Sequence, residues 1–163
     1  MQKGDHAVMT GWGFLGLRLP VPDETWQADI MTIVKAIGPW GRDEKGMEAR
    51  VGAIKALKLA RLDDETFQKA RTKMIAACAK CHSSRFGKEH LELADEIIKE
   101  TTHLMARAVR VVEQLYTDGI LPLTEDGPKH PDLLLFYDSP TEIEQELYKM
   151  FMLHRQKAFQ GAI

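Results

Sequence analysis

The longest helical pattern in the chain covers about residues 88–117, and it constrains the fold more than any other feature. Apolar residues recur there at helical spacing, at Leu91, Ala94, Ile98, Met105, Ala108, Val112 and Leu115. Such residues share one side of an α-helix, and Asp118-Gly119 is a typical helix end. At 1.5 Å per residue this helix is about 45 Å long. This helix is longer than the small hydrophobic core that a chain of 163 residues can form around it.

Two shorter helices are predicted before residue 62. Asp23 is a suitable N-cap, and the residues behind it are apolar at helical spacing: Trp26, Ile30, Ile33, Val34 and Ile37. Gly38-Pro39 ends that helix. A second amphipathic stretch covers about residues 44–60, with an expected inward face of Met47, Val51, Ile54 and Leu57. Residues 7–22 are apolar but rich in Gly and Pro, so we expect an irregular arm that packs on something.

Two further helices are predicted after residue 62. One begins at Asp63-Asp64-Glu65, and its inner side is expected to hold Phe67, Met74, Cys78 and Cys81. The last begins at S-P-T-E (139–142), where Ser139 and Glu142 fit a capping box and Pro140 fits the first helical position. Its expected apolar face is Ile143, Leu147, Met150, Phe151, His154 and Ala158.

No segment alternates polar and apolar residues in the manner of a strand. The sequence therefore predicts an all-α fold of four to five helices, with two long helices near the C-terminus. We divide it into residues 1–62, an arm plus two short helices, and residues 63–163, a helical region, which together form one structural unit.

Composition excludes several classes of protein. The formal net charge is −2, which does not favour a nucleic-acid partner. No apolar run is long enough to span a membrane. The N-terminus also lacks the apolar stretch of a signal peptide.

The only two cysteines lie in C-A-K-C-H, residues 78–82. Cys78, Cys81 and His82 have the order and spacing of a c-type haem attachment site, in which two sulfurs bond the haem and the histidine ligates the iron. Zinc would need a second ligand pair, and His90 could join only through a sharp reversal. A redox dithiol favours a helix N-terminus, whereas this motif is predicted near a helix C-terminus. A chance occurrence is the remaining alternative. We expect one covalent haem c at the C-terminal end of a helix, with His82 as the proximal ligand.

The sixth ligand of the iron is less defined by the sequence. His154 lies on the predicted apolar face of the last helix, where a histidine is more often a core residue than a ligand. His103 shares a stripe with charged residues, and His90 lies early in the long helix, so both are expected at the surface. His6 lies in the irregular arm. His154 is thus the candidate distal ligand, and His6 is a candidate ligand of a haem that this chain does not contain.

Longer stretches resemble the octahaem hydroxylamine oxidoreductase family of multihaem cytochromes c. M-I-A-A-C-A-K-C-H-S-S-R-F (74–86), followed by a long helix, is similar to the last haem-binding segment of that family. Residues 133–151 and 154–163 resemble its C-terminal helical region, and residues 5–20 resemble the segment after its penultimate haem motif. The resemblance implies that Cys78 and Cys81 are the thioether cysteines, that His82 is the proximal ligand, and that His6 ligates a haem attached upstream. It also implies an antiparallel pair formed by helices 88–117 and 140–162, with subunit contacts on their outer sides.

The chain departs from that family because it has one haem motif where the family has eight. The family's catalytic haem belongs to an upstream motif that is absent here, and its cross-linking tyrosine is expected beyond residue 163, so it is not assigned to Tyr116, Tyr137 or Tyr148. We therefore expect the C-terminal portion of a larger periplasmic, or otherwise extracytoplasmic, protein that forms homo-oligomers.

Three functions are considered, the first of them implied by the resemblance. The first is an electron-transfer unit of a multihaem oxidoreductase of nitrogen compounds, oxidising hydroxylamine or hydrazine or reducing nitrite. Its partners would be other haem-bearing segments and a redox protein, and the chain alone would not turn over, because a haem ligated on both faces has no open position. The second is a free-standing monohaem helical cytochrome c. The third is a non-haem helical interaction module.

Overall fold

The computed structural model describes residues 17–18, 23–38, 43–56, 60–61, 64–122, 130–135 and 141–162. The helices are α2 (Glu24–Lys35), α3 (Glu44–Ala56), α4 (Asp64–Cys78), α5 (Ser84–Thr117) and a last helix that runs from α6 (Glu142–Lys149) through a π-helical turn η1 (Met150–His154) into α7 (Arg155–Gly161). Two strands of two residues, β1 (Leu17–Arg18) and β2 (Ala60–Arg61), pair in parallel. With α6, η1 and α7 taken as one helix, the described residues form five helices, and the all-α prediction is confirmed.

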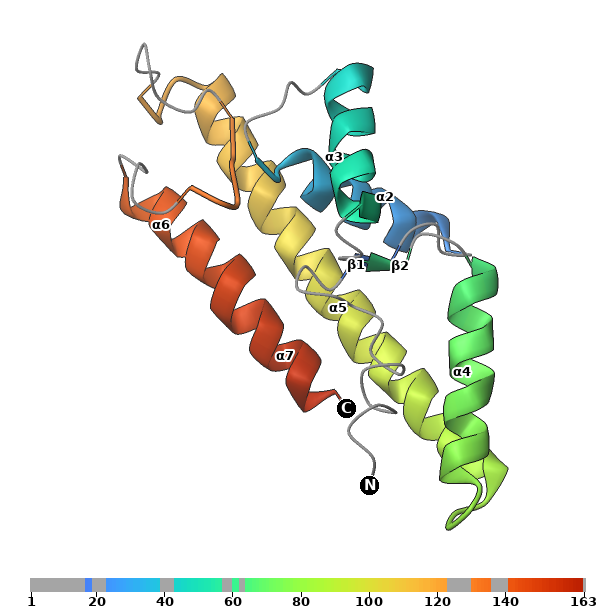
Figure 1. The fold of residues 1–163 in the computed structure, drawn as a ribbon. Helices are drawn as coiled ribbons and strands as arrows, with labels where there is room; N and C mark the ends of the chain where they lie inside the picture. The colour runs from blue at the N-terminus through green and yellow to red at the C-terminus, as the bar shows by residue number, and fades with distance from the viewer. Residues whose placement is uncertain are drawn as a thin grey trace.

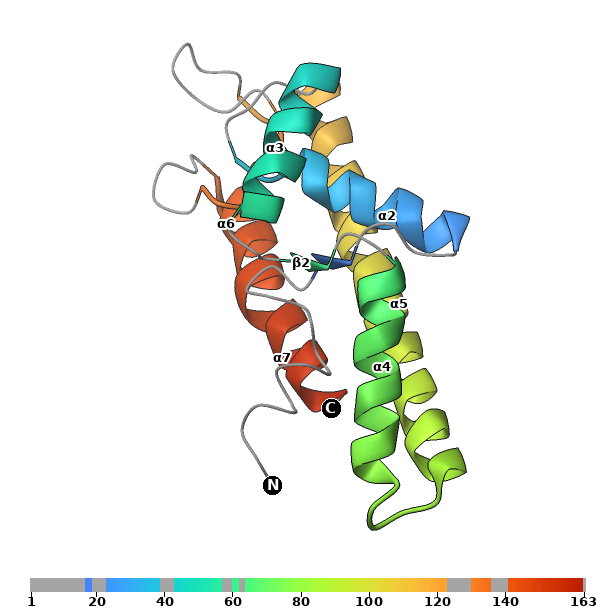
Figure 2. The ribbon, with the colours of Figure 1, turned by 45° about the vertical axis from the view of Figure 1, so that its right-hand side comes forward.

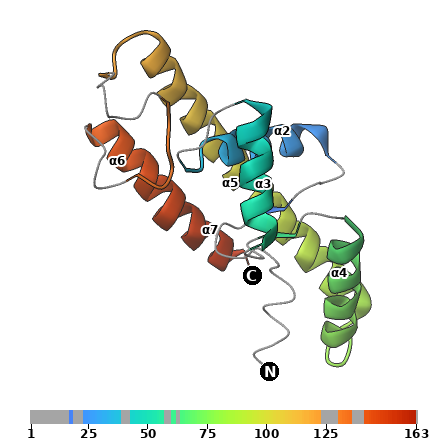
Figure 3. The ribbon, with the colours of Figure 1, turned by 45° about the horizontal axis from the view of Figure 1, so that its top comes forward.

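Helix α5 has 34 residues and is the element on which α2, α4 and the last helix pack. Figure 1 shows α6–η1–α7 lying along one side of α5 and running in the opposite direction, as the antiparallel pair that the family resemblance implied. Helix α2 crosses the other side of α5, with α3 beyond it (Figure 2). Helix α4 folds back only on the N-terminal part of α5. The α4–α5 hairpin therefore projects from the body of the molecule (Figure 3).

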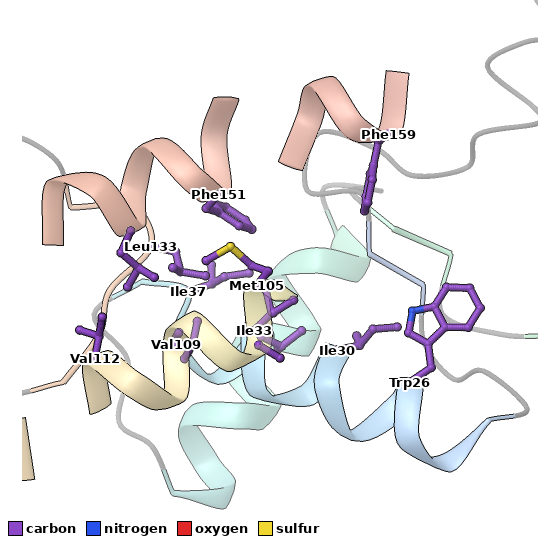
Figure 4. Close-up of a cluster of buried hydrophobic side chains, with 14 of the residues drawn as sticks. Trp26, Ile30, Ile33, Ile37, Met105, Val109, Val112, Leu133, Phe151 and Phe159 are labelled. Carbon is purple, nitrogen blue, oxygen red and sulfur yellow. The ribbon is translucent and has the colours of Figure 1, made fainter. Parts of the chain in front are cut away.

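The hydrophobic core lies where α2, the C-terminal part of α5 and the last helix meet (Figure 4). All five residues predicted to face inward on α2 are buried: Trp26, Ile30, Ile33, Val34 and Ile37. Met105, Val109 and Phe151 are fully buried in the same cluster. Because Trp26 and Phe159 belong to one cluster, the core includes side chains from both sides of residue 62. The division at that residue stays a prediction.

The C-terminal end of α2 is fixed by polar contacts from two other segments. The buried side chain of Arg50, on α3, donates to the carbonyl oxygens of Ile37 at 2.7 Å and Gly38 at 3.5 Å. The Asp132 carboxylate accepts from the Gly38 N–H at 3.0 Å. Gly38 has φ of 76°, a conformation that glycine adopts without strain. The helix thus ends where the sequence predicted, and the carbonyls of Ile37 and Gly38, just beyond its end, have partners.

The start of the last helix differs from the prediction. Thr141 is the N-cap, and Thr141 and Glu144 form the capping box in place of Ser139 and Glu142. Both pairs have the required spacing of three residues, so the sequence alone could not separate them. Ser139 and Pro140 lie outside the described residues.

The buried face of the last helix is also different from the predicted one, and His154 is not part of it. The buried side chains recur at intervals of three or four residues at Glu144, Leu147, Phe151, Arg155 and Phe159, whereas Ile143 and His154 are exposed. In an α-helix each step of four residues turns the face by about 40°. The π-helical turn Met150–His154 inserts an extra residue per turn and keeps Phe151, Arg155 and Phe159 in line. The α-helical spacing used for the prediction could not anticipate this turn.

Several predicted features fall outside the described residues. These are His6 with the arm to residue 16, Leu57, Tyr137, and the side chains of Ile54 and Phe67. None of the described helices is both long enough and apolar enough to cross a membrane.

Candidate haem-binding site

The C-A-K-C-H motif forms the turn between α4 and α5. Cys78 is the last residue of α4, and its carbonyl oxygen accepts from the N–H groups of Cys81 at 3.1 Å and His82 at 2.9 Å. Ser83 is the N-cap of α5 and accepts from the N–H of Phe86 at 3.1 Å. This cap starts α5 at Ser84, four residues before the predicted start. The two cysteines and the histidine therefore lie in one short turn, which the Cys78 carbonyl fixes at its start and the Ser83 cap fixes at its end.

The two helices of the hairpin approach closely beside Cys78. Gly87 is buried, and a Cβ atom added to it would lie 3.1 Å from the Cβ of Cys78. Further along the hairpin, Arg71 on α4 donates to Asp95 on α5 at 2.5 Å. The glycine thus permits a close approach at the cysteine end, and the ion pair joins the two helices about two turns later.

The turn fits covalent attachment of a haem. Both thiols are free, with Cys78 half-buried against the helix seam and Cys81 exposed. His82 is exposed as well. The two sulfurs and the imidazole are therefore within one turn of backbone and open on one side, where a macrocycle could be bonded.

The proximal candidate His82 begins a row of three aromatic rings. Its imidazole stacks on Phe86 with a centroid distance of 4.5 Å and an interplanar angle of 20°. Phe86 contacts His90 in turn, at 4.1 Å and 55°. Phe86 and His90 are four positions apart and share one face of α5, and His82 lies four positions before Phe86 in the turn. Sequence analysis missed Phe86 as a neighbour of the site, although this spacing could have revealed it.

The surroundings of His103 differ from the predicted ones. It was expected on a solvated stripe, but its Nδ1 lies 2.8 Å from an oxygen of Asp29, and the ring is only half-exposed. Asp29 is buried on α2 and also accepts from Arg110 of α5. His103 and Arg110 therefore join α5 to α2, a role visible only when the two helices are placed together.

Of the remaining histidines that the structure describes, neither His130 nor His154 is brought to the turn. His154 is exposed on the last helix, which lies away from the α4–α5 turn in all three views. The Nδ1 of His130 lies 3.0 Å from the carbonyl oxygen of Pro131, in the segment 130–135 whose Asp132 contacts the end of α2. Across the part of the chain that the structure describes, no three His, Cys, Asp or Glu residues are grouped as a metal site would require. The zinc alternative gains no support from the geometry.

Comparison with known proteins identifies the kind of site. Residues 50–127, which include the turn, match the family model described as seven times multi-haem cytochrome CxxCH. The chain contains a multihaem cytochrome c segment. Its cofactor is covalently bound c-type haem. The family is described by repeated motifs, whereas this sequence contains one.

A curated relative gives a partial match. The chain is 30% identical over 87 residues to a probable nitrite reductase-hydroxylamine oxidoreductase fusion protein of Kuenenia stuttgartiensis. The match covers 52% of this chain and 10% of the relative, so the chain corresponds to a small part of that protein. No solved structure matches the chain. The resemblance to the hydroxylamine oxidoreductase family agrees with both matches.

Proposed function

We propose that the chain is an electron-transfer unit of a multihaem oxidoreductase that acts on nitrogen compounds. The observation that carries this proposal is the C-A-K-C-H turn, closed between α4 and α5 inside the segment that matches the multihaem cytochromes. The name of the Kuenenia protein supports the class of reaction, because it combines nitrite reduction and hydroxylamine oxidation. The catalytic haem belongs to another part of the parent protein.

Three residues of the turn have roles in this proposal. Cys78 and Cys81 form thioethers with the haem, and His82 is the proximal ligand of the iron. Haem supplies one-electron redox chemistry, while the protein sets its potential through ligands and burial. The close approach at Gly87 keeps Cys78 at a fixed place on the helix seam. The stacking of Phe86 restricts the rotation of the His82 ring.

The second axial ligand is proposed to come from a residue that the fold does not place beside His82. His154 stays the candidate, but its helix lies away from the turn, so it would reach this haem only from another copy of the chain in the proposed homo-oligomer. His6 is proposed to ligate a haem carried elsewhere in the parent protein. We propose that the partners of the chain are other haem-bearing segments or subunits and a redox partner protein. The parent protein is proposed to be a periplasmic or otherwise extracytoplasmic homo-oligomer.

Haem attachment is the direct test. We would export the chain to the periplasm behind an added leader, together with haem-maturation proteins, and record an intact mass and a reduced-minus-oxidised visible spectrum. We expect the mass of one covalent haem and sharp c-type bands. Cys78→Ser combined with Cys81→Ser should remove both, and His90→Ala, an exposed histidine in the same hairpin, should keep both. A folded, haem-free wild-type chain would overturn the proposal.

The axial ligands need a separate measurement. His82→Ala should remove the low-spin spectrum of any haem that is still attached, because the iron loses its proximal ligand. His154→Ala should convert the ferric haem from low-spin to high-spin only if His154 is the sixth ligand. An unchanged spectrum in the His154 variant would assign the sixth position to a group from outside this helix.

A further inference from the structure

We propose that the tip of the α4–α5 hairpin is a docking surface for an electron-transfer protein with an acidic face. The surface is a basic collar around the haem turn, made of Lys73, Lys80, Arg85 and Lys88. This inference rests on the proposed haem at Cys78, Cys81 and His82, because the collar matters for electron transfer only if the redox centre is there.

The distribution of charge along the sequence first indicates the collar. The chain has a formal net charge of −2, but every charged residue from 66 to 88 is basic. That stretch contains six of them: Lys69, Arg71, Lys73, Lys80, Arg85 and Lys88. The haem motif thus lies inside a positive segment of a slightly negative chain.

The structure shows that the collar is exposed and only partly neutralised. All four of its side chains are exposed. Arg85 pairs with Glu89 at 2.7 Å and Lys88 with Glu92 at 3.7 Å, both on the solvent side of α5. Lys73 and Lys80 pair with no acidic group among the residues that the structure describes. Between residues 73 and 90 there are four basic residues and one acidic residue, a net charge of +3.

The collar and the haem turn are presented together. Lys80 lies between the two cysteines, and Arg85 lies in the first turn of α5. The hairpin projects away from the core, so the turn is accessible from several directions (Figures 1 and 3). A partner that approaches the exposed edge of this site therefore meets positive charge on α4, on the turn and on α5.

Electrostatics favours an acidic protein as the partner. Charges around an accessible site steer oppositely charged molecules toward it and increase the rate of encounter by roughly ten- to a thousandfold. Electron transfer between proteins needs rapid and reversible encounters, which weak charge pairing provides. A membrane surface is disfavoured, because the basic residues surround a turn on two helices and do not line one face of a single amphipathic helix.

Small redox reagents of opposite charge can measure this field directly. One electron passes from the ferrous haem to ferricyanide, giving ferric haem and ferrocyanide, and tris(phenanthroline)cobalt(III) accepts one electron in the same way. We would compare stopped-flow oxidation rates of the haem-loaded full chain with these two reagents at about 0.1 M ionic strength, where charges act over about 10 Å. Lys73→Glu combined with Lys80→Glu should slow ferricyanide about threefold or more and accelerate the cobalt reagent by a similar factor.

The matched control reverses the charge of two exposed lysines that lie outside the hairpin. Lys45→Glu combined with Lys157→Glu changes the net charge by the same amount, on α3 and α7. The carboxylates of the haem are the same in every variant, so differences report the protein's charges. We expect less than about a 1.5-fold change with either reagent. The variant Lys73→Glu combined with Lys80→Glu is called the collar variant. Equal effects of the two double variants, or no effect of the collar variant, would overturn the inference.

Lys80 lies inside the attachment motif, so its variant could lose haem for another reason. The single variant Lys73→Glu avoids this problem and should show about half of the logarithmic effect. Haem content is measured before each rate. Wild-type chain without haem contradicts the proposed function, whereas haem-loaded chain without a charge effect contradicts only the docking surface.

A last comparison separates the kinds of partner. Poly-L-glutamate serves as the probe for an acidic polypeptide, and vesicles of phosphatidylglycerol serve as the probe for an anionic membrane. Poly-L-glutamate should slow the reaction with ferricyanide in the wild type and have little effect in the collar variant. Stronger inhibition by the vesicles than by the polypeptide would overturn the assignment in favour of a membrane surface.

Discussion

The two ends of α5 lie in different surroundings. From Ile98 to Tyr116 the helix contributes to the main core, where Met105 and Val109 are fully buried between α2 and the last helix. From Ser84 to Ile97 it packs mainly on α4, and its buried side is limited to Gly87, Leu91 and Ala94. One helix thus joins a tightly packed body to a thin hairpin that carries the candidate haem site. The buried side chains are concentrated in the first region, and the proposed redox site lies in the second.

Phe151→Ala should show the largest effect, because it opens the packed region. The ring is fully buried against α5, and truncation of such a phenylalanine costs about 3–5 kcal/mol of the free energy of unfolding. Leu153→Ala is the matched control on the same helix, since Leu153 is 51% exposed and should cost about 0.5 kcal/mol or less. Urea unfolding of the haem-loaded chain measures both. Similar losses would mean that the last helix buries the side that carries His154.

Tyr116 gives the packed region a dependence on alkaline pH. Its hydroxyl donates to the buried carboxylate of Glu144, and burial together with this contact raises the pKa of Tyr116 far above its usual value near 10. Above pH 10 the unfolded chain therefore loses a proton that the folded chain keeps. The free energy of unfolding should fall by about 1.4 kcal/mol per pH unit from this residue, starting near pH 10.

The control for this dependence is Tyr116→Phe. At neutral pH it should cost about 1–3 kcal/mol, because Glu144 loses a buried donor. Above pH 10 its unfolding free energy should decline less steeply than that of the wild type. Parallel curves for the two proteins would contradict the role of Tyr116, whatever other groups titrate in that range.

A pair of glycines tests how closely the hairpin is packed. Both lie inside helices, where alanine normally adds about 0.5–1 kcal/mol of stability. Gly52→Ala should gain this amount, because no atom of a neighbouring residue lies within 4 Å of the added Cβ. Gly87→Ala should lose stability instead, by about 1 kcal/mol, because its Cβ would press on Cys78 at 3.1 Å. Thermal unfolding measures both, and a gain in both variants would show that α4 can move away freely.

The same contrast explains what could be predicted from the sequence. Residues buried by local periodicity were predicted well, as on α2, where Ile30 and Val34 face the core. The candidate ligands Cys78, Cys81 and His82 were found from their spacing alone. Features that depend on the relative placement of helices were not, as with His103, which bonds Asp29 from another helix. The exposure of His154 was missed because a π-helical turn changes the periodicity on which the prediction relied.

Phe86→Ala should show the smallest effect on stability, although it lies beside the candidate haem ligand. The ring is 42% exposed, so its removal should change the free energy of unfolding by about 0.5 kcal/mol or less. Leu93→Ala, seven residues further along α5 and 51% exposed, should behave in the same way. Urea unfolding of the haem-loaded variants gives the values. A loss above about 1.5 kcal/mol in Phe86→Ala alone would mean that the bound haem packs on this ring, and the hairpin tip would then have a small core of its own. Small losses in both variants would leave the covalent bonds and the axial ligand as the groups that hold the haem, with the stability of the chain provided by the other end of α5.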